Sequence, residues 1–190
     1  MHIRLSREPG PEPYETGGGI KFAKPLITDT EPFIAHNADI LSNMNPLFFV
    51  KQATKNKTAL ASLLVMPPRP EDDRFFLFRP EDMRLAGWTN ARTGEIRGAV
   101  RGVPGAPPDS PASEECRRMS FCGIHLISQE IFALLENWPE RFSITDFYIR
   151  EAGRHPIYGI PAPEGFRIID IGSPGALAEA EKALRHQGSR

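Results

Sequence analysis

Two stretches of the sequence are apolar almost throughout, and they constrain the fold more than any other feature. Residues 58–66 read TALASLLVM, and residues 119–127 read MSFCGIHLI. A strand with one exposed face alternates between apolar and polar residues, so a continuous apolar run predicts a strand that is covered on both faces. The chain therefore needs helices or further sheet on each side of these strands.

Capping residues mark the helices that could supply this cover. Ser and Asn accept hydrogen bonds from the first free N–H groups of a helix, and Pro fits its first turn. The predicted helices are residues 20–27, cut by Pro25, a helix that begins at Asn43 or Asn45 with Pro46, and helices that begin at Ser128, Ser143 and Ser173. Strands and helices therefore alternate, which predicts an α/β fold with a mostly parallel sheet. We expect residues 1–190 to form a single domain.

The middle of the sequence interrupts this alternation. The segments RFFLF and RLAGW, followed by a turn at Thr93 and Gly94, predict a β-hairpin insert within residues 67–98. Residues 98–115 are rich in proline and glycine, which predicts a loop. Two more strands are predicted at residues 157–160 and 166–171.

Composition excludes several classes of protein. The formal net charge is -1, so no overall field attracts nucleic acid or an acidic membrane surface. The amino terminus lacks the apolar core of a signal peptide, and no apolar stretch approaches the roughly 20 residues that span a bilayer. Cys116 and Cys122 lack the spacing of a zinc site, so we expect buried free thiols, with a disulfide or a metal role as the alternatives. These features predict a cytoplasmic protein that binds neither nucleic acid nor membrane.

Two aspartates far apart in the sequence are candidate metal ligands. Asp39 follows the apolar run at residues 32–35, and Asp170 interrupts a predicted strand, where an unpartnered carboxylate would be costly to bury. Ligands of open α/β sheets bind beyond the carboxyl ends of strands, and Mg²⁺ typically takes one or two carboxylates together with waters and phosphates. We therefore expect Asp39 and Asp170 to share Mg²⁺. The alternatives are a local cap or turn at Asp39 and hydrogen bonds from neighbouring N–H groups to Asp170.

Other residues carry weaker signals, each with a structural alternative. The glycine triplet in ETGGGIK lets a backbone approach a ligand beside a helix N-terminus, or forms a flexible turn. Trp88 is either a stacking platform for a sugar or base, or a core residue. Gly123 within a strand indicates a close backbone approach to a ligand. Asp146, three residues after Ser143, either contacts a ligand or completes a capping box.

Taken in order, five segments resemble the sugar-1-phosphate nucleotidyltransferases. They are ETGGGIK, FIAHNADIL, FCGIHLIS, FSITDFY and RIIDIGSPGALAEAEKAL. The resemblance runs from about Ile3 to Leu184, in particular to small bacterial enzymes that act on mannose 1-phosphate or N-acetylmuramic acid 1-phosphate. It implies a Rossmann-like three-layer α/β/α fold and a role in cell-wall precursor metabolism. The implied reaction transfers a nucleotidyl group from an NTP (UTP or GTP) to a sugar 1-phosphate and releases pyrophosphate.

The resemblance also implies roles for particular residues. Asp39 and Asp170 match the aspartates that hold Mg²⁺. The implied nucleotide contacts are Thr16, Gly17 and Gly18, and the implied sugar contacts are Asn37, Trp88, Gly123 and Asp146. No catalytic residue is singled out, because in-line transfer depends on positioning and on neutralising phosphate charge.

In one respect the sequence departs from this family. Family members begin with a strand and a glycine-rich loop, G-x-G-T-R-x-x-P, which cradles the triphosphate, and the 190 residues contain no such segment. We therefore expect an N-terminally truncated fold with little turnover, since losing even one charge-stabilising donor costs on the order of 10²–10³ in rate. We also expect an open sheet edge beside the strand before Asp39, which favours self-association or a partner chain. The alternatives to an enzyme are a non-catalytic nucleotide-sugar-binding or regulatory module and an interaction subunit.

Overall fold

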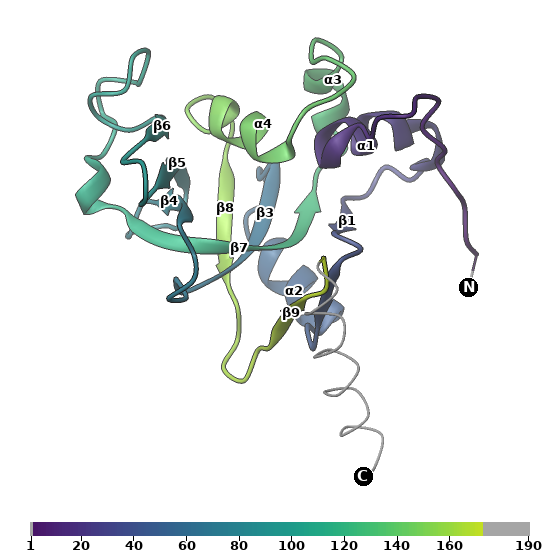
Figure 1. The fold of residues 1–190 in the computed structure, drawn as a ribbon, viewed down its shortest axis with the longest axis horizontal. Coiled ribbons are helices and arrows are strands. Elements are labelled where there is room, and N and C mark those ends of the chain that lie inside the picture. The colour runs from purple at the N-terminus through teal and green to yellow at the C-terminus, as the bar shows by residue number, and fades with distance from the viewer. Residues whose placement is uncertain (1, 173–190) are drawn as a thin grey trace.

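A seven-stranded sheet forms the centre of the protein (Figure 1). The computed structural model describes residues 2–172. Six strands follow the order β6-β5-β4-β7-β3-β8, β1 also pairs with β7, and β2 and β9 form a separate two-stranded sheet. The strands are β1 (Phe33–His36), β2 (Ile40–Ser42), β3 (Ala61–Met66), β4 (Arg74–Phe78), β5 (Leu85–Asn90), β6 (Ile96–Gly98), β7 (Arg117–Ile127), β8 (Ile157–Pro161) and β9 (Ile168–Asp170). The α-helices are α1 (Glu15–Ala23), α2 (Pro46–Ala53), α3 (Ile131–Leu135) and α4 (Ile144–Glu151), with 3-10 turns at Lys24–Leu26 and Ser113–Glu115.

The sheet is mostly antiparallel, so the expectation of a mostly parallel sheet was wrong. The long strand β7 pairs antiparallel with β1, β3 and β4, and β4, β5 and β6 form an antiparallel meander. Among the described strands only β3 and β8 pair in parallel. The apolar runs do mark strands covered on both faces, but a covered strand looks the same in sequence whichever way its neighbour runs. The hairpin predicted within residues 67–98 corresponds to β4 and β5 and is confirmed.

Helices cover both faces of the sheet, as expected for a layered α/β fold (Figure 1). Successive residues of β3 point to opposite sides, so Leu63 packs in the cluster beneath α4 whereas Leu64 packs with Phe49 of α2. Cys122 lies in the α2 cluster, where burial raises the pKa of its thiol to about 12. Both cysteines are free thiols, Cys122 buried and Cys116 half-buried.

The helix starts were predicted with mixed success. Asn45 caps α2, its side chain accepting hydrogen bonds from the N–H groups of Leu47 and Phe48. The buried residues of α2 are Phe49 and Ala53, whereas Leu47 is 82% exposed. Helix α1 begins at Glu15, earlier than predicted, so the glycine triplet lies inside it rather than in a turn. The helix predicted from Ser173 lies outside the described residues.

A buried histidine–tyrosine pair links the sheet to α4. His125 of β7 and Tyr148 of α4 are fully buried, and His125 Nδ1 lies 2.6 Å from the Tyr148 hydroxyl. Burial raises the pKa of Tyr148. Burial, and to a smaller extent His36, lowers the pKa of His125 to about 3. The folded protein therefore holds a neutral imidazole at this position over most of the pH range.

His125 is expected to make the fold sensitive to acid. Because its folded pKa of about 3 lies below the value of about 6.5 for an unfolded histidine, the unfolded chain binds the extra proton between these values. The free energy of unfolding therefore falls as the pH falls below about 6.5, and this loss is absent above it. The substitution His125→Gln should reduce the slope of stability against pH by ~1.4 kcal/mol per unit between about pH 6 and pH 4. Urea unfolding across this range measures the slope, and an unchanged slope would contradict the neutral buried state.

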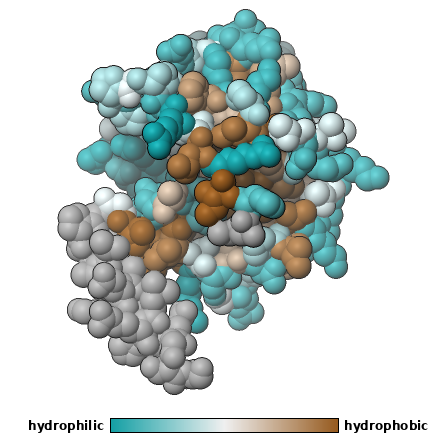
Figure 2. All heavy atoms as spheres, turned by 90° about the vertical axis from the view of Figure 1, so that its right-hand side faces the viewer, coloured by the Kyte–Doolittle hydropathy of each residue, from teal (hydrophilic) through white to brown (hydrophobic). Residues whose placement is uncertain are grey.

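Strand β1 has an open edge within residues 2–172. Its residues pair with β7 on one side, and no described strand pairs with the other side. Figure 2 shows apolar side chains gathered in the middle of the face of the molecule that carries β1 and the N-terminal segment. Ile3 and Leu5 of that segment are each 73% exposed. None of the described helices is both long enough and apolar enough to cross a membrane.

Candidate functional site

The structure brings Asp39 and Asp170 together. The strand after Asp39 (β2) pairs antiparallel with β9, so that Ile40 lies opposite Asp170, and the N–H of Ile171 donates to the Asp39 carbonyl at 2.7 Å. The two carboxylates also face one point. From the position that a Cβ on Gly172 would occupy, Asp170 Oδ1 lies at 3.0 Å and Asp39 Oδ2 at 3.5 Å. Two acidic side chains more than a hundred residues apart therefore meet beside one glycine.

The surroundings of these carboxylates differ from the sequence-based expectation. Asp170 is exposed, so the argument from the cost of burying it was wrong. Its Oδ1 accepts a hydrogen bond from the N–H of Gly172 at 2.8 Å, which is the local alternative considered above. Within residues 2–172 no cluster of three or more His, Cys, Asp or Glu side chains could hold a metal. Two exposed carboxylates still match the way Mg²⁺ is bound, because that ion keeps waters and substrate phosphates as its other ligands.

Two of the predicted sugar contacts, Asn37 and Gly123, lie against each other. The N–H of Asn37 donates to the Gly123 carbonyl at 2.9 Å. Gly123 has a φ of +70°, and a Cβ there would lie 3.0 Å from Asn37 Nδ2. The glycine therefore provides room for the Asn37 side chain and a backbone conformation that other residues rarely adopt. The group that closely approaches Gly123 is the Asn37 side chain, whereas the predicted approach was to a ligand, which stays a prediction.

The other two predicted sugar contacts, Trp88 and Asp146, share a partner that sequence reasoning missed. The Arg97 guanidinium lies 4.3 Å from the centre of the Trp88 ring, and its Nη1 lies 2.8 Å from Asp146 Oδ1. Asp146 therefore does not complete a capping box, and α4 is capped by Ser143, which accepts from the N–H of Thr145. Trp88 is only 8% exposed, so it serves the core as well as the site.

A polar groove of about 660 Å³ runs past this cluster. Trp88, Arg97 and Asp146 line it on one side, and Glu15, at the start of α1, also contributes. Glu15 has a φ of +60°, an uncommon backbone conformation for a residue other than glycine. The groove thus joins the start of α1 to the start of α4. Asn37, Asp39, Gly123 and Asp170 are not among its lining residues, so the predicted site residues fall into separate groups.

A hydrogen-bonded network of Arg69, Asp72 and Ser120 supports the wall of the groove. Asp72 lies 2.9 Å from Arg69 Nη2, and the Ser120 hydroxyl of β7 donates to it at 2.5 Å. Partial burial opposes ionisation of Asp72, but the hydrogen bonds from Arg69 and Ser120 outweigh it and lower its pKa. The carboxylate therefore stays charged and holds the segment before β4 against β7. No sequence pattern marked these three residues.

The predicted nucleotide contacts Thr16, Gly17 and Gly18 form the first turn of α1. Thr16 is exposed, whereas Gly17 and Gly18 are buried against the segment before α4. Their N–H groups both donate to the Phe142 carbonyl, at 3.1 and 3.3 Å. A Cβ on Gly17 would overlap the Phe142 ring, and a Cβ on Gly18 would overlap the Glu140 carbonyl oxygen. The glycines thus allow helix and loop to touch.

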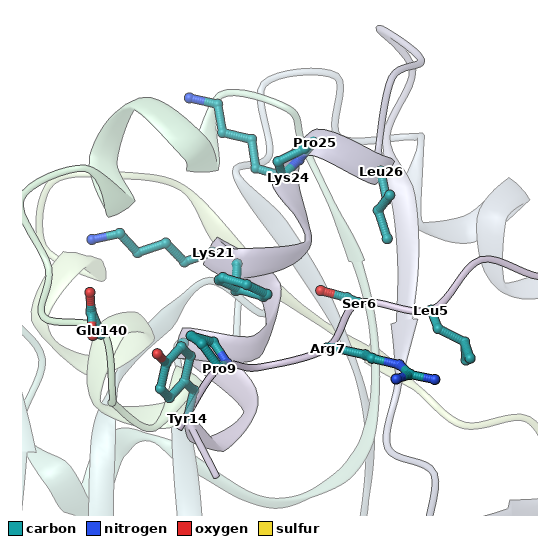
Figure 3. Close-up of a pocket in the computed structure, with 12 residues that line it drawn as sticks. Leu5, Ser6, Arg7, Pro9, Tyr14, Lys21, Lys24, Pro25, Leu26 and Glu140 are labelled. Carbon is teal, nitrogen blue, oxygen red and sulfur yellow. The ribbon is translucent and has the colours of Figure 1, made fainter. Parts of the chain in front are cut away.

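A second hollow, of about 550 Å³, lies between the N-terminal segment and α1 (Figure 3). Leu5 and Leu26 line it together with Tyr14 and Gly18. In Figure 3 the ammonium groups of Lys21 and Lys24 point away from Leu5 and Ser6, and Lys21 Nζ donates to the Trp138 carbonyl at 2.5 Å. The hollow is therefore mainly apolar, and among the predicted residues only Gly18 reaches it.

Solved structures share this fold at low sequence identity. HddC from Yersinia pseudotuberculosis, complexed with GMP-PN, superposes with a TM-score of 0.59 at 17% identity, covering 92% of this chain and 64% of that chain. A UDP-glucose pyrophosphorylase from Acinetobacter baumannii gives 0.58 at 19% identity, covering 93% and 59%. A UTP-bound UGPase from Acinetobacter baumannii gives 0.59 at 18% identity, covering 91% and 57%.

These likenesses concern the fold. No family profile and no curated protein matches the sequence. The chain spans 57% to 64% of the length of the three structures named above. The fold is thus an α/β fold similar to that of sugar-1-phosphate nucleotidyltransferases, in agreement with the resemblance of the sequence.

Proposed function

We propose that this chain is a protein of the sugar-1-phosphate nucleotidyltransferase family, which transfers a nucleotidyl group from an NTP to a sugar 1-phosphate with Mg²⁺ and releases pyrophosphate. The meeting of the Asp39 and Asp170 carboxylates is the observation that carries the proposal. The fold shared with nucleotide-bound proteins supports it.

The chemistry requires little from the protein beyond position and charge. Bound Mg²⁺ would supply positive charge to the phosphates during in-line displacement. In the proposed arrangement Asp39 and Asp170 hold that ion, and the first turn of α1, with Thr16, Gly17 and Gly18, lies on the nucleotide side. The groove beside Trp88 and Asp146 receives the sugar, and its polar lining suits hydroxyl groups.

Asn37 and Gly123 support the backbone next to the carboxylate pair. Asn37 lies over Gly123 and, two residues before Asp39, links β7 to the carboxylate pair. We propose that Asn37 and Gly123, whose expected role was contact with the sugar, instead fix the backbone that presents Asp39 to the metal ion. This assigns them a positioning role, because their observed contacts are with each other.

Pyrophosphate release tests the proposal. The chain is incubated with Mg²⁺, with UTP or GTP, and with a panel of sugar 1-phosphates, while thermal unfolding is followed in parallel. Release of pyrophosphate that depends on one sugar supports the enzyme. A nucleotide-dependent rise in Tm without release favours a nucleotide-sugar-binding module. Absence of both effects for every nucleotide contradicts the proposal.

The open edge of β1 favours a second candidate, an interaction subunit. An unpaired strand with exposed apolar residues nearby is a template for pairing with another chain. If this candidate is correct, the protein self-associates or becomes soluble only with a partner chain, and it does not bind nucleotides. Light scattering on the same samples separates the two candidates, because a monomer with a sharp unfolding transition would count against the second.

A further inference from the structure

Another hollow lies behind the Arg97–Asp146 pair. It has a volume of about 480 Å³ and is bounded by the loop after β6 and by the C-terminal half of α4. Arg97 and Asp146 line both this rear cavity and the polar groove, so the pair forms a wall between them. The sequence analysis and the proposed function assign nothing to this rear cavity.

The side chains that line the two hollows differ in the sign of their net charge. The rear cavity is lined by Arg97, Arg150 and Arg154 and by a single carboxylate, Asp146. The polar groove has as many arginines, but they face a larger number of carboxylates, namely Glu15, Asp72, Glu95 and Asp146. An anion is therefore drawn to the rear cavity rather than to the groove.

The rear cavity has a defined wall. Gly153, just after α4, packs so closely on the loop that a Cβ there would lie 3.3 Å from Ala99 Cβ and 3.7 Å from the Pro107 ring. The loop is tied to its surroundings by hydrogen bonds from Ala99 N to Ala86 O at 2.6 Å and from Arg101 N to Pro111 O at 2.8 Å. Loop and helix are thus held together around the space that the arginines line.

The arginines are partly positioned and incompletely paired. Arg97 lies on Trp88. Arg150 lies 5.1 Å from the centre of the Trp138 ring, and its Nε lies 4.0 Å from Glu151 Oε1, so this arginine is loosely paired. Arg97 Nε is buried and makes no hydrogen bond within residues 2–172, although Glu95 Oε1 lies 3.3 Å away. The Arg154 guanidinium has no ion pair or side-chain hydrogen bond to any described residue. Donors of the kind that bind phosphate are therefore available.

We propose that the rear cavity binds a phosphate group, either as inorganic phosphate or as part of a small phosphomonoester. The anion bridges Arg154 and Arg150 and competes with Asp146 for the Arg97 guanidinium. Guanidinium groups suit this role because their planar N–H donors match two phosphate oxygens at once. The carbonyl end of α4 opposes an anion, but full charges on three arginines outweigh partial charges on one short helix. A bound anion would weaken the Arg97–Asp146 ion pair, which separates the rear cavity from the polar groove. The Asp146 carboxylate would then be available to the groove.

The chain carries its own reporters for this site. Its two tryptophans, Trp88 and Trp138, each stack with an arginine of the rear cavity. Titration with inorganic phosphate at constant ionic strength should therefore change tryptophan fluorescence in a saturable way. A parallel titration with glycerol phosphate shows whether a phosphomonoester is preferred. Neither titration contains Mg²⁺ or NTP, so failure of the proposed transferase reaction leaves this result intact.

Variants decide whether the rear cavity is responsible. The double variant Arg150→Gln/Arg154→Gln should raise the half-saturating concentration at least ~10-fold, whereas Arg117→Gln, an exposed arginine of β7, should leave it unchanged. Asp146→Asn removes the competing carboxylate and should lower that concentration several-fold, a gain that general damage to the fold would not produce. Absence of saturation with both ligands, or an unchanged midpoint in the double variant and in Asp146→Asn, would overturn the proposal.

Discussion

Replacement of Gly18 by alanine is expected to lower the free energy of unfolding by ~3 kcal/mol, near the upper end for overpacking a close contact. The added Cβ would overlap the Glu140 carbonyl oxygen and lie 2.9 Å from Tyr14 Cβ. Both are backbone or near-backbone atoms, so neither can move without shifting α1 or the segment before α4. For a chain of this size the Tm should fall by roughly 6–12 °C. Calorimetry or thermal melting followed by circular dichroism measures the change.

Gly19→Ala is the matched control, because it lies next in the same helix. The nearest atom to a Cβ on Gly19 is Glu8 Oε1 at 3.3 Å, the end of a flexible side chain. Alanine should there raise stability by ~0.5 kcal/mol through its higher helix propensity. If Gly18→Ala and Gly19→Ala changed the free energy of unfolding equally, the contact between α1 and the segment before α4 would not require glycine at position 18. If Gly18→Ala also loses nucleotide binding, the comparison with Gly19→Ala shows whether the loss follows from reduced stability or from a lost ligand contact.

Neutralising either candidate metal ligand is expected to remove the effect of Mg²⁺ while leaving the fold in place. Asp39→Asn or Asp170→Asn should abolish the Mg²⁺-dependent rise in Tm with NTP and lower any pyrophosphate release on the order of 10²–10³-fold. Both side chains are exposed, so their own effect on stability should stay within about 0.5 kcal/mol. Thermal shift with and without Mg²⁺ measures the first effect.

The control for this pair is Asp109→Asn, an exposed aspartate in the loop between β6 and β7. It changes the net charge by the same amount and should retain the full response to Mg²⁺. A response that survives in both Asp39→Asn and Asp170→Asn would place the ion elsewhere. A response lost in all three variants would point to bulk charge rather than to a site.

Local signals in the sequence predicted many of the elements, although not β2, and they did not predict the direction of the strands. The run at residues 58–66 gave β3, and the cap at Asn45 gave α2, because burial and capping act over a few residues. Helix α1 was placed too late because glycine disfavours helices, and the contact with Phe142 that overrides this preference comes from a distant segment. Strand direction also depends on distant partners, since β7 enters between β1 and β3 late in the chain.

In the candidate site, too, short-range features could be predicted from the sequence, whereas contacts between distant segments could not. Asp39 after one apolar run and Asp170 within another together suggested a shared site, and the pairing of β2 with β9 brings the two residues together. Arg97 could not be found in this way. Trp88 becomes its neighbour through the pairing of β5 with β6, and Asp146 does so only when α4 packs against these strands. The exposure of Asp170 could likewise not be predicted from the apolar residues around it, since exposure depends on which segments pack over the strand.

Paramagnetic broadening by Mn²⁺, a substitute for Mg²⁺, tests the shared metal site most directly. In a backbone amide NMR spectrum of the 190-residue chain, small additions of Mn²⁺ should first broaden the signals of Ile40, Ile171 and Gly172, which adjoin the two carboxylates. The same additions should leave these signals sharp in the double variant Asp39→Asn/Asp170→Asn. Broadening that begins elsewhere, or that is identical in the double variant, would contradict a metal ion held between Asp39 and Asp170.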